Sequence, residues 1–304
     1  MTTPERYTTP GGVEAAIKEA ARQATRDEPS VSISERIRQE HFRRFLSRVF
    51  AEGERSEWLL KGGTGVLARV PSARATKDVD LFRAGYTLDE SVDDLQRLVS
   101  ADLGDHFRFE LVSQIPSLAG PEQPYVDGYT LTFRVYIGAQ PRGEVKVDLA
   151  SGAGVTDEVS VIQPANALPL PRLISAPYRV YPVVDQIADK ICATHALYSG
   201  LRSSRQKDLV DLVVFTCTHD IHGYALRIAI ETEARRRGLS PLQRVDLPPM
   251  WGPEYSRSAR HIPYCADFTD IDAARALMEK FFEPALRGQA DNFVWNHERL
   301  EWTH

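Results

Sequence analysis

Two aspartates, Asp78 and Asp80, are separated by a single residue in the segment K-D-V-D-L-F. On a strand, residues two apart point to the same side, so both carboxylates would face one way while Val79 and Leu81 face the core. Neighbouring anions repel each other unless a cation or a proton offsets their charge. The pair therefore predicts a site for Mg²⁺, although a D-x-D pair taken alone is more often a solvated strand edge.

A glycine pair precedes the aspartates, between a short apolar segment and a short predicted helix. Gly62 and Gly63 let backbone N–H groups approach phosphate oxygens, and Thr64 adds a hydroxyl at the start of the helix. A glycine pair alone is more often a turn. Bases that can neutralise triphosphate oxygens surround it, namely Lys61, Arg69, Arg74 and Lys77.

Further along the chain, E-V-K-V-D-L predicts a strand on which Lys146 and Asp148 share one face. Asp148 can then join the aspartate pair, and Lys146 can moderate the charge. The alternative is a solvated strand with alternating polar residues.

Two predicted helices carry further charged candidates. Lys190 borders the apolar face of its helix, where its ammonium could reach a phosphate or lie at the surface in water. Lys207 and Asp211 lie one helical turn apart, with Asp208 beside them. These three residues allow an ion pair within the helix as well as a role in a site.

Apolar periodicity predicts the elements that must position these side chains. The expected helices cover a frayed arm up to residue 27 and then 32–52, 88–101, 184–198, 206–218, 224–237 and 271–286, and the expected strands cover 107–115, 129–137 and 144–149. The stretch 152–182 is rich in proline, glycine and serine, which disfavours continuous helix. We therefore expect an α+β chain with a first lobe at 1–165 and a mainly helical lobe at 166–304.

The bulk properties exclude several classes of function. The net charge of −5 gives no global attraction to nucleic acid, so RNA would have to meet local bases. Two groups of arginines could supply them, with solvated helix faces as the more frequent alternative: Arg43, Arg44 and Arg48, and Arg235, Arg236 and Arg237. The three cysteines fit neither a disulfide framework nor a zinc site, and no apolar run spans a membrane, so we expect a cytoplasmic protein.

The segments L-K-G-G-T at 60–64 and R-x-T-x-D-V-D-L at 74–81 resemble the AbiEii/MenT-type nucleotidyltransferase toxins, a branch of the polymerase-beta-like superfamily. The resemblance continues, in the family's order, through E-V-K-V-D-L, D-Q-I-A-D-K-I and K-D-L-V-D-L. It implies a polymerase-beta-like core with a mixed, mostly antiparallel sheet, followed by a helical lobe. The family superclass often has Gly-Ser where this chain has Gly-Gly-Thr, so Thr64 would have to supply the hydroxyl.

The resemblance also implies an activity. A nucleoside triphosphate would donate its monophosphate to the 3′ acceptor end of a tRNA, with Mg²⁺ or Mn²⁺ bound, and so block translation until a separate antitoxin intervenes. The implied metal ligands are Asp78, Asp80 and Asp148, which with Lys190 and Asp211 form the expected catalytic set. The implied nucleotide-binding residues are Lys61, Gly62, Gly63, Thr64, Arg74, Lys146, Lys190 and Asp208, and Thr76 resembles a position where phosphorylation could block the site.

The same residues allow two rival functions. The enzyme could modify a small molecule or a protein side chain, as other nucleotidyltransferases do. Alternatively, the site could survive only as a non-catalytic scaffold that binds a partner protein or RNA.

Overall fold

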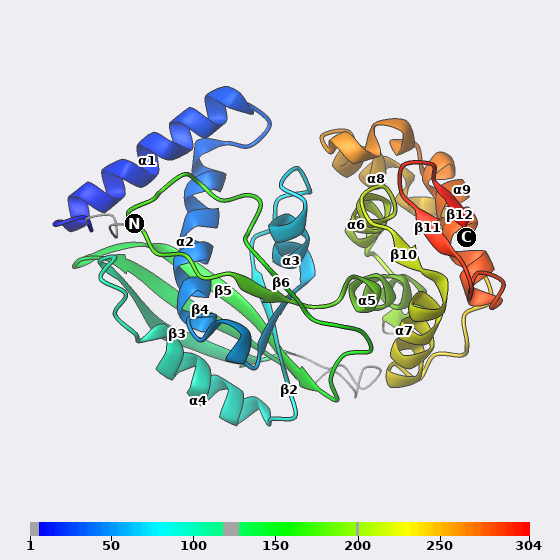
Figure 1. Ribbon diagram of the computed structural model, residues 1–304, viewed down its shortest axis with the longest axis horizontal. Coiled ribbons are helices and arrows are strands. Elements are labelled where there is room, and N and C mark those ends of the chain that lie inside the picture. Colours follow the sequence, from blue (N-terminus) through cyan, green and yellow to red (C-terminus); the bar gives the residue numbers. More distant parts are fainter. Residues whose placement is uncertain (1–5, 118–127, 199–200) are drawn as a thin grey trace.

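A mixed sheet forms the centre of the first lobe (Figure 1). The computed structural model describes residues 6–117, 128–198 and 201–304, and within these residues the sheet has seven strands in the order β3-β4-β5-β2-β1-β7-β6. In that order the strands are Phe107–Pro116, Gly128–Ile137, Gln140–Gly152, Val79–Ala84, Trp58–Lys61, Tyr178–Val180 and Ser160–Ile162. Only the pairs β2·β5 and β1·β7 are parallel. The predicted α+β class with a mostly antiparallel sheet is confirmed.

Four helices pack around this sheet within the described residues: α1 (Pro10–Asp27), α2 (Ile33–Val49), α3 (Gly62–Arg69) and α4 (Leu88–Val99). A short 3₁₀ helix, η1, covers Gly53–Arg55. The prediction that the first helix is a frayed arm is wrong. Val13, Ile17 and Ala21 are buried in the core of the lobe, because their spacing of four residues places them on one face of α1.

Three arginines of α2, Arg43, Arg44 and Arg48, lie in the interior of the protein. Arg48 forms a bidentate pair with the buried Asp105, at 2.7 and 3.1 Å. Arg43 donates to the carbonyls of Asn166 and Leu168, and Arg44 donates to that of Ile174. These guanidinium groups therefore neither bind RNA nor form a solvated face, contrary to both sequence-based interpretations.

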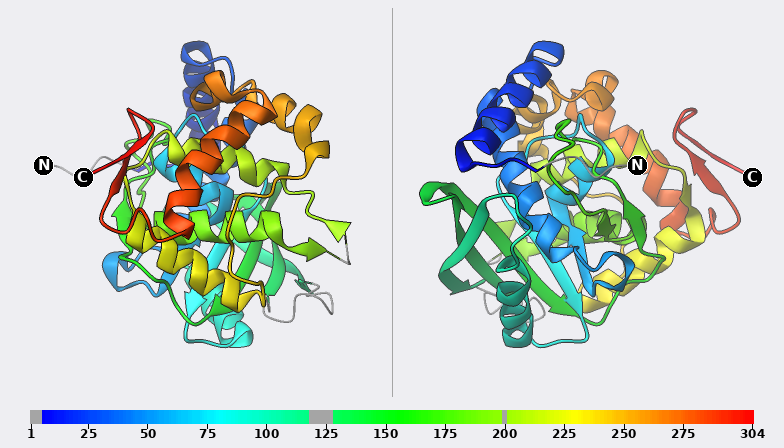
Figure 2. Two further views of the ribbon diagram at one scale, coloured as in Figure 1. Left: turned by 90° about the vertical axis from the view of Figure 1, so that its right-hand side faces the viewer. Right: turned by 60° about the vertical axis from the view of Figure 1, so that its left-hand side comes forward.

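The second lobe is mainly helical. Its helices are α5 (Val183–His195), α6 (Gln206–Thr216), α7 (Gly223–Arg236), α8 (Gly252–Ala259) and α9 (Ile271–Leu286), with 3₁₀ turns η2 (Pro249–Trp251) and η3 (Pro263–Phe268). The short strands β8 (Leu197–Tyr198), β9 (Leu201–Arg202), β10 (Ile221–His222), β11 (Val294–Asn296) and β12 (Glu301–Thr303) were not expected. Figure 2 shows β11 and β12, in red, on the outer side of this lobe. No helix in the described part of the chain is long and apolar enough to cross a membrane.

The chain leaves the first lobe later than the expected boundary. Strand β7 pairs with β1 in the main sheet, and the buried Leu168, Leu170 and Leu173 belong to the core of the first lobe. Residues from Val184 onward belong to the other core. We propose a division near residue 181 in place of the expected 165.

Candidate active site

Two strands in register bring the predicted carboxylates together. Asp80 on β2 is paired with Asp148 on β5 in the parallel ladder, and Lys61 on β1 is the partner of Asp80 on the other side. Strand β2 begins at Val79, so Asp78 precedes the strand instead of lying on it. Val79 and Leu81 are buried, as predicted, so the pleat turns the side chain of Asp80 away from the core.

The glycines of α3 make the close approach to these carboxylates feasible. Gly62 has φ +58°, and a Cβ there would lie 1.9 Å from Oδ2 of Asp80. A Cβ on Gly63 would lie 3.0 Å from the Thr76 hydroxyl. The N-terminus of α3, which carries the positive end of the helix dipole, therefore lies against Asp80.

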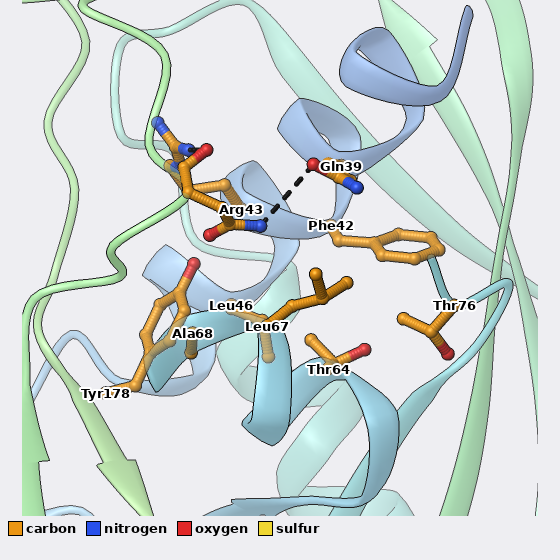
Figure 3. Close-up of a pocket in the computed structure, with 10 residues that line it drawn as sticks. Gln39, Phe42, Arg43, Leu46, Thr64, Leu67, Ala68, Thr76 and Tyr178 are labelled. Atoms are coloured by element: carbon orange, nitrogen blue, oxygen red, sulfur yellow. Dashed lines mark hydrogen bonds between the residues drawn. The ribbon is translucent and has the colours of Figure 1, made fainter. Parts of the chain in front are cut away.

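Two buried hydroxyls hold the loop that carries Asp78. Thr64 donates to the Asp78 carbonyl at 2.7 Å, and Thr76 donates to the Asp78 carboxylate at 2.8 Å. Figure 3 shows both threonines beside Phe42 and Leu67, around a cavity of about 20 Å³ between α2 and α3. The Thr64 hydroxyl thus binds the backbone of the loop, and Thr64 lines the small cavity between α2 and α3. Thr76 is 4% exposed, and its regulation by phosphorylation stays a prediction.

Two cavities meet at the carboxylates. The first cavity, of about 530 Å³, is lined by residues that include Gly63, Arg74, Lys77, Lys190 and Asp208. The second cavity, of about 600 Å³, is lined by residues that include Lys61, Phe82, Tyr181 and Arg236. Both are lined by Gly62, Asp80, Asp148, Asp189, Arg205 and Arg237. Lys146 is exposed and does not appear in either lining.

A buried ion network joins the lobes at the wall of the first cavity. The Lys190 ammonium donates to Asp208 at 2.9 Å and to Asp211 at 2.7 Å. Arg74, which comes from the first lobe, donates to the same oxygen of Asp211 at 2.8 Å. Burial would lower the pKa of Lys190, but Asp211 and Asp208 outweigh it and raise that pKa. The structure thus pairs Asp211 with Lys190 and Arg74 across elements, whereas the expected alternative paired it with Lys207 inside α6.

The carboxylates of the site repel one another. Burial, together with the charges of Asp78 and Asp148 and against the opposing effect of Lys61, raises the pKa of Asp80 to about 7. Burial likewise raises the pKa of Asp148, aided by Asp78 and opposed by a hydrogen bond from Thr130. Uncompensated negative charge of this kind, on oxygen ligands, is suited to a divalent cation.

The arrangement of the carboxylates suits a metal only in part. Among the described residues, no group of three or more His, Cys, Asp or Glu side chains already converges on one point. Asp78 and Asp148 each have one carboxylate oxygen held by a threonine hydroxyl, Thr76 and Thr130 respectively. The donor set therefore fits Mg²⁺ in its chemistry, while the carboxylates have to turn toward a shared ion to bind it.

Sequence reasoning missed two residues of α5 that line the cleft. Gln186 is 2% exposed, and neither its amide nitrogen nor its amide oxygen has a hydrogen-bond partner in the described part of the chain. Asp189 bonds Arg237 and lies in both cavity linings. Gln186 precedes Lys190 by one helical turn, so its position on the same helix face was the signal available in the sequence.

Comparison with known families identifies the chain. The sequence profile of the nucleotidyl transferase AbiEii toxin, from a type IV toxin-antitoxin system, matches residues 44–299, which include every segment of the site described above. The chain belongs to the AbiEii family. It is therefore a nucleotidyltransferase that uses a nucleoside triphosphate, and its family implies an antitoxin as partner.

One solved structure supports the fold, and a second is a weaker match. The nucleotidyltransferase toxin MenT4 from Mycobacterium tuberculosis H37Rv superposes with a TM-score of 0.53 over 89% of this chain and 98% of its own, at 16% identity. JHP933 from Helicobacter pylori matches with a TM-score of 0.44 over 86% and 97% of the two chains, at 13% identity. Among curated proteins, none matches this AbiEii chain by sequence. At such identities the likeness concerns the fold alone.

Proposed function

We propose that this AbiEii enzyme transfers a nucleoside monophosphate from a nucleoside triphosphate to the 3′ acceptor end of tRNA in the cytoplasm and so blocks translation. One observation carries the proposal. Asp80 and Asp148 lie in register on adjacent strands, against the Gly62 turn, where two cavities large enough for two substrates meet. A group-transfer enzyme needs this meeting of a donor and an acceptor at one charged centre.

Asp78, Asp80 and Asp148 would hold Mg²⁺, with Mn²⁺ as the alternative ion. When bound, the metal supplies charge neutralisation at the triphosphate and lowers the pKa of a coordinated hydroxyl. Asp148, with its raised pKa, is suited to accept the proton of the attacking hydroxyl. The hydroxyl oxygen then forms a bond to the α-phosphorus, and the bond to the bridging oxygen breaks to release pyrophosphate.

The chain provides donors for the triphosphate in the first cavity. The N–H groups of Gly62 and Gly63 lie at the positive end of α3, and Arg74 and Lys77 line the same wall. Lys190 has three N–H donors, of which two are used by Asp208 and Asp211. Within the described part of the chain the third N–H has no acceptor, so it can bind a phosphate oxygen and stabilise the leaving pyrophosphate.

The rival functions make different predictions in one assay. The purified protein is incubated with Mg²⁺, total tRNA and one labelled nucleoside triphosphate at a time. We expect label at the RNA 3′ end with a preferred triphosphate, and none after chelation of the metal. Label on protein or on a small molecule would reject tRNA as the acceptor.

Asp80→Asn tests whether the site is catalytic. We expect a loss of at least about 100-fold in transfer, because an amide cannot replace a metal-bridging carboxylate. Asp93→Asn, on the exposed surface of α4, is the matched control and should retain full transfer. Toxicity that survives Asp80→Asn would instead support the non-catalytic scaffold.

A further inference from the structure

The second cavity has no role in the binding of triphosphate as described above. We propose that it binds the 3′-terminal segment of a single-stranded RNA acceptor, and that Arg236 holds the phosphate next to the reacting hydroxyl. This assignment rests on the proposed function, since it concerns the acceptor of that reaction. It adds a binding site, the residues that form it and the chemical class of its ligand.

Group transfer requires that the acceptor reach the carboxylates from a different side than the triphosphate. An attacking hydroxyl and a leaving pyrophosphate are roughly in line through the phosphorus, so they occupy opposite sides of it. The first cavity contains the Gly63 turn, Arg74 and Lys190, which suit the triphosphate. The second cavity reaches Asp80 and Asp148 from other elements, and its volume of about 600 Å³ admits a nucleotide.

The walls of the second cavity suit a terminal nucleotide. Phe82 from β2 and Tyr181, just after β7, pack edge to face with ring centroids 5.5 Å apart. The Lys61 ammonium lies 5.9 Å from each of these rings. The two rings are only 5% and 6% exposed, so they back the cavity with an apolar surface, while Lys61, Arg236 and Arg237 line the same cavity. A positively charged groove of this kind can follow a single-stranded backbone. The adjoining wall is made of the small residues of segment 150–153, which leave room for a sugar.

The three consecutive arginines at the end of α7 are not equivalent. Arg237 is held by Asp189 and by Glu233, the latter at 2.6 Å, and its side chain is 10% exposed. Arg235 is exposed and lines a separate cavity of about 260 Å³ with Leu239 and Leu242.

Of the three arginines, Arg236 is the one that both lines the second cavity and is oriented by a hydrogen bond to the backbone. Its side chain is 32% exposed, lines the second cavity, donates to the Gly154 carbonyl at 2.8 Å and lies 3.7 Å from a carboxylate oxygen of Glu233. A guanidinium has five N–H donors, so donors remain for a phosphate. Of the three arginines that the sequence offered as possible RNA contacts, the proposal therefore selects Arg236, and the exposed Arg235 serves as a control.

The test measures RNA binding and nucleotide binding separately on the full chain. RNA binding is followed by fluorescence anisotropy with a labelled single-stranded oligoribonucleotide that carries a free 3′-hydroxyl. Nucleotide binding is followed by thermal stabilisation with the preferred triphosphate and Mg²⁺. We expect Arg236→Ala to weaken RNA binding about tenfold and to reduce the salt dependence of that binding by about one phosphate contact, with unchanged nucleotide stabilisation. Arg236→Lys should recover part of the RNA affinity, because it keeps the charge.

The controls separate this assignment from the function on which it rests. Arg235→Ala should change neither measurement. Equal losses of RNA binding in Arg235→Ala and Arg236→Ala would reject a specific site at Arg236. If Arg236→Ala changes only the stabilisation by nucleotide, the assignment of the two cavities is reversed. If the wild-type protein labels a non-RNA acceptor, the proposed function itself fails. If it labels RNA while Arg236→Ala keeps the wild-type RNA affinity, only the site assignment fails.

Discussion

At the level of single residues, the side-chain amide of Gln186 is unusual because it is buried without a hydrogen-bond partner among the described residues. It lies between α5 and α3, where a Cβ on Gly65 would come within 2.7 Å of its nitrogen. A buried amide without partners costs about 1–3 kcal/mol of folding free energy. Such a group is retained at functional sites where a ligand completes its hydrogen bonds, and Gln186 lines the first cavity next to the phosphate donors.

Gln186→Leu separates stability from function. Because the substitution removes unpaired polar atoms at similar volume, we expect the free energy of unfolding to rise by about 1 kcal/mol. Triphosphate affinity should fall about tenfold, which corresponds to about 1.4 kcal/mol. Urea unfolding and triphosphate titration check the two effects, with Gln96→Leu on the exposed face of α4 as the control. Lower stability with unchanged affinity would indicate a purely structural amide.

His41 makes the stability of the protein depend on pH. Burial lowers the pKa of His41 from 6.5 to about 4. The folded state therefore binds this proton less readily than the unfolded chain, so the contribution is complete above pH 6.5 and is lost as the pH falls toward 4. Between pH 7.5 and 4.5 we expect the free energy of unfolding to fall by about 2–3 kcal/mol through this residue. His41→Leu should show a correspondingly smaller fall in urea unfolding, and an equal fall in both proteins would contradict the assignment.

At the level of elements, the second half of α2 is structural, because its charged side chains Glu40, Arg43, Arg44 and Arg48 are buried. The Arg48 guanidinium contacts Asp105 and also the carbonyls of Arg44, Ala101 and Phe107. A buried charge that loses its partner is strongly destabilising. The basic composition of this helix therefore reflects internal hydrogen bonding.

Arg48→Ala should reduce the free energy of unfolding by about 3–5 kcal/mol, because it leaves the Asp105 carboxylate buried and unpaired. Arg97→Ala, at an exposed position of α4, should change it by less than about 0.5 kcal/mol. Thermal or urea unfolding measures both. A stable Arg48→Ala protein that loses only RNA affinity would restore the interpretation of α2 as an RNA-binding helix.

At the level of the whole molecule, α3 serves both lobes. Its N-terminus shapes the site, while Val66, Leu67 and Val70 are buried in the core of the helical lobe. The cross-lobe pair of Arg74 and Asp211 adds a polar link beside this packing. We therefore expect the two lobes to fold as one interdependent unit.

We expect a fragment of residues 182–304 to lack a stable fold, because it is cut off from the α3 side chains that complete its core. Near-ultraviolet circular dichroism and amide dispersion in an NMR spectrum should show loosely packed helices. Addition of residues 1–181 in trans should restore tertiary signals. A well-dispersed spectrum of the fragment alone would show that the helical lobe is independent.

The sequence by itself determined the local features. Helix 271–286 was predicted with its observed bounds, and strand 129–137 within one residue, because apolar periodicity depends on neighbours in the chain. The segments that contain Gly62, Asp80 and Asp148 resemble those of the AbiEii/MenT-type nucleotidyltransferase toxins, and the match to the AbiEii family confirmed this class.

Only the tertiary structure decided the features that depend on distant partners. Arg48 and Arg236 have the same side chain on helices with similar patterns, yet one is buried against Asp105 and the other lines a cavity. Asp211 meets Lys190 and Arg74 because three elements converge there. The solvation and charge environment of a side chain are set by residues far away in sequence, and short-range patterns contain no information about those residues.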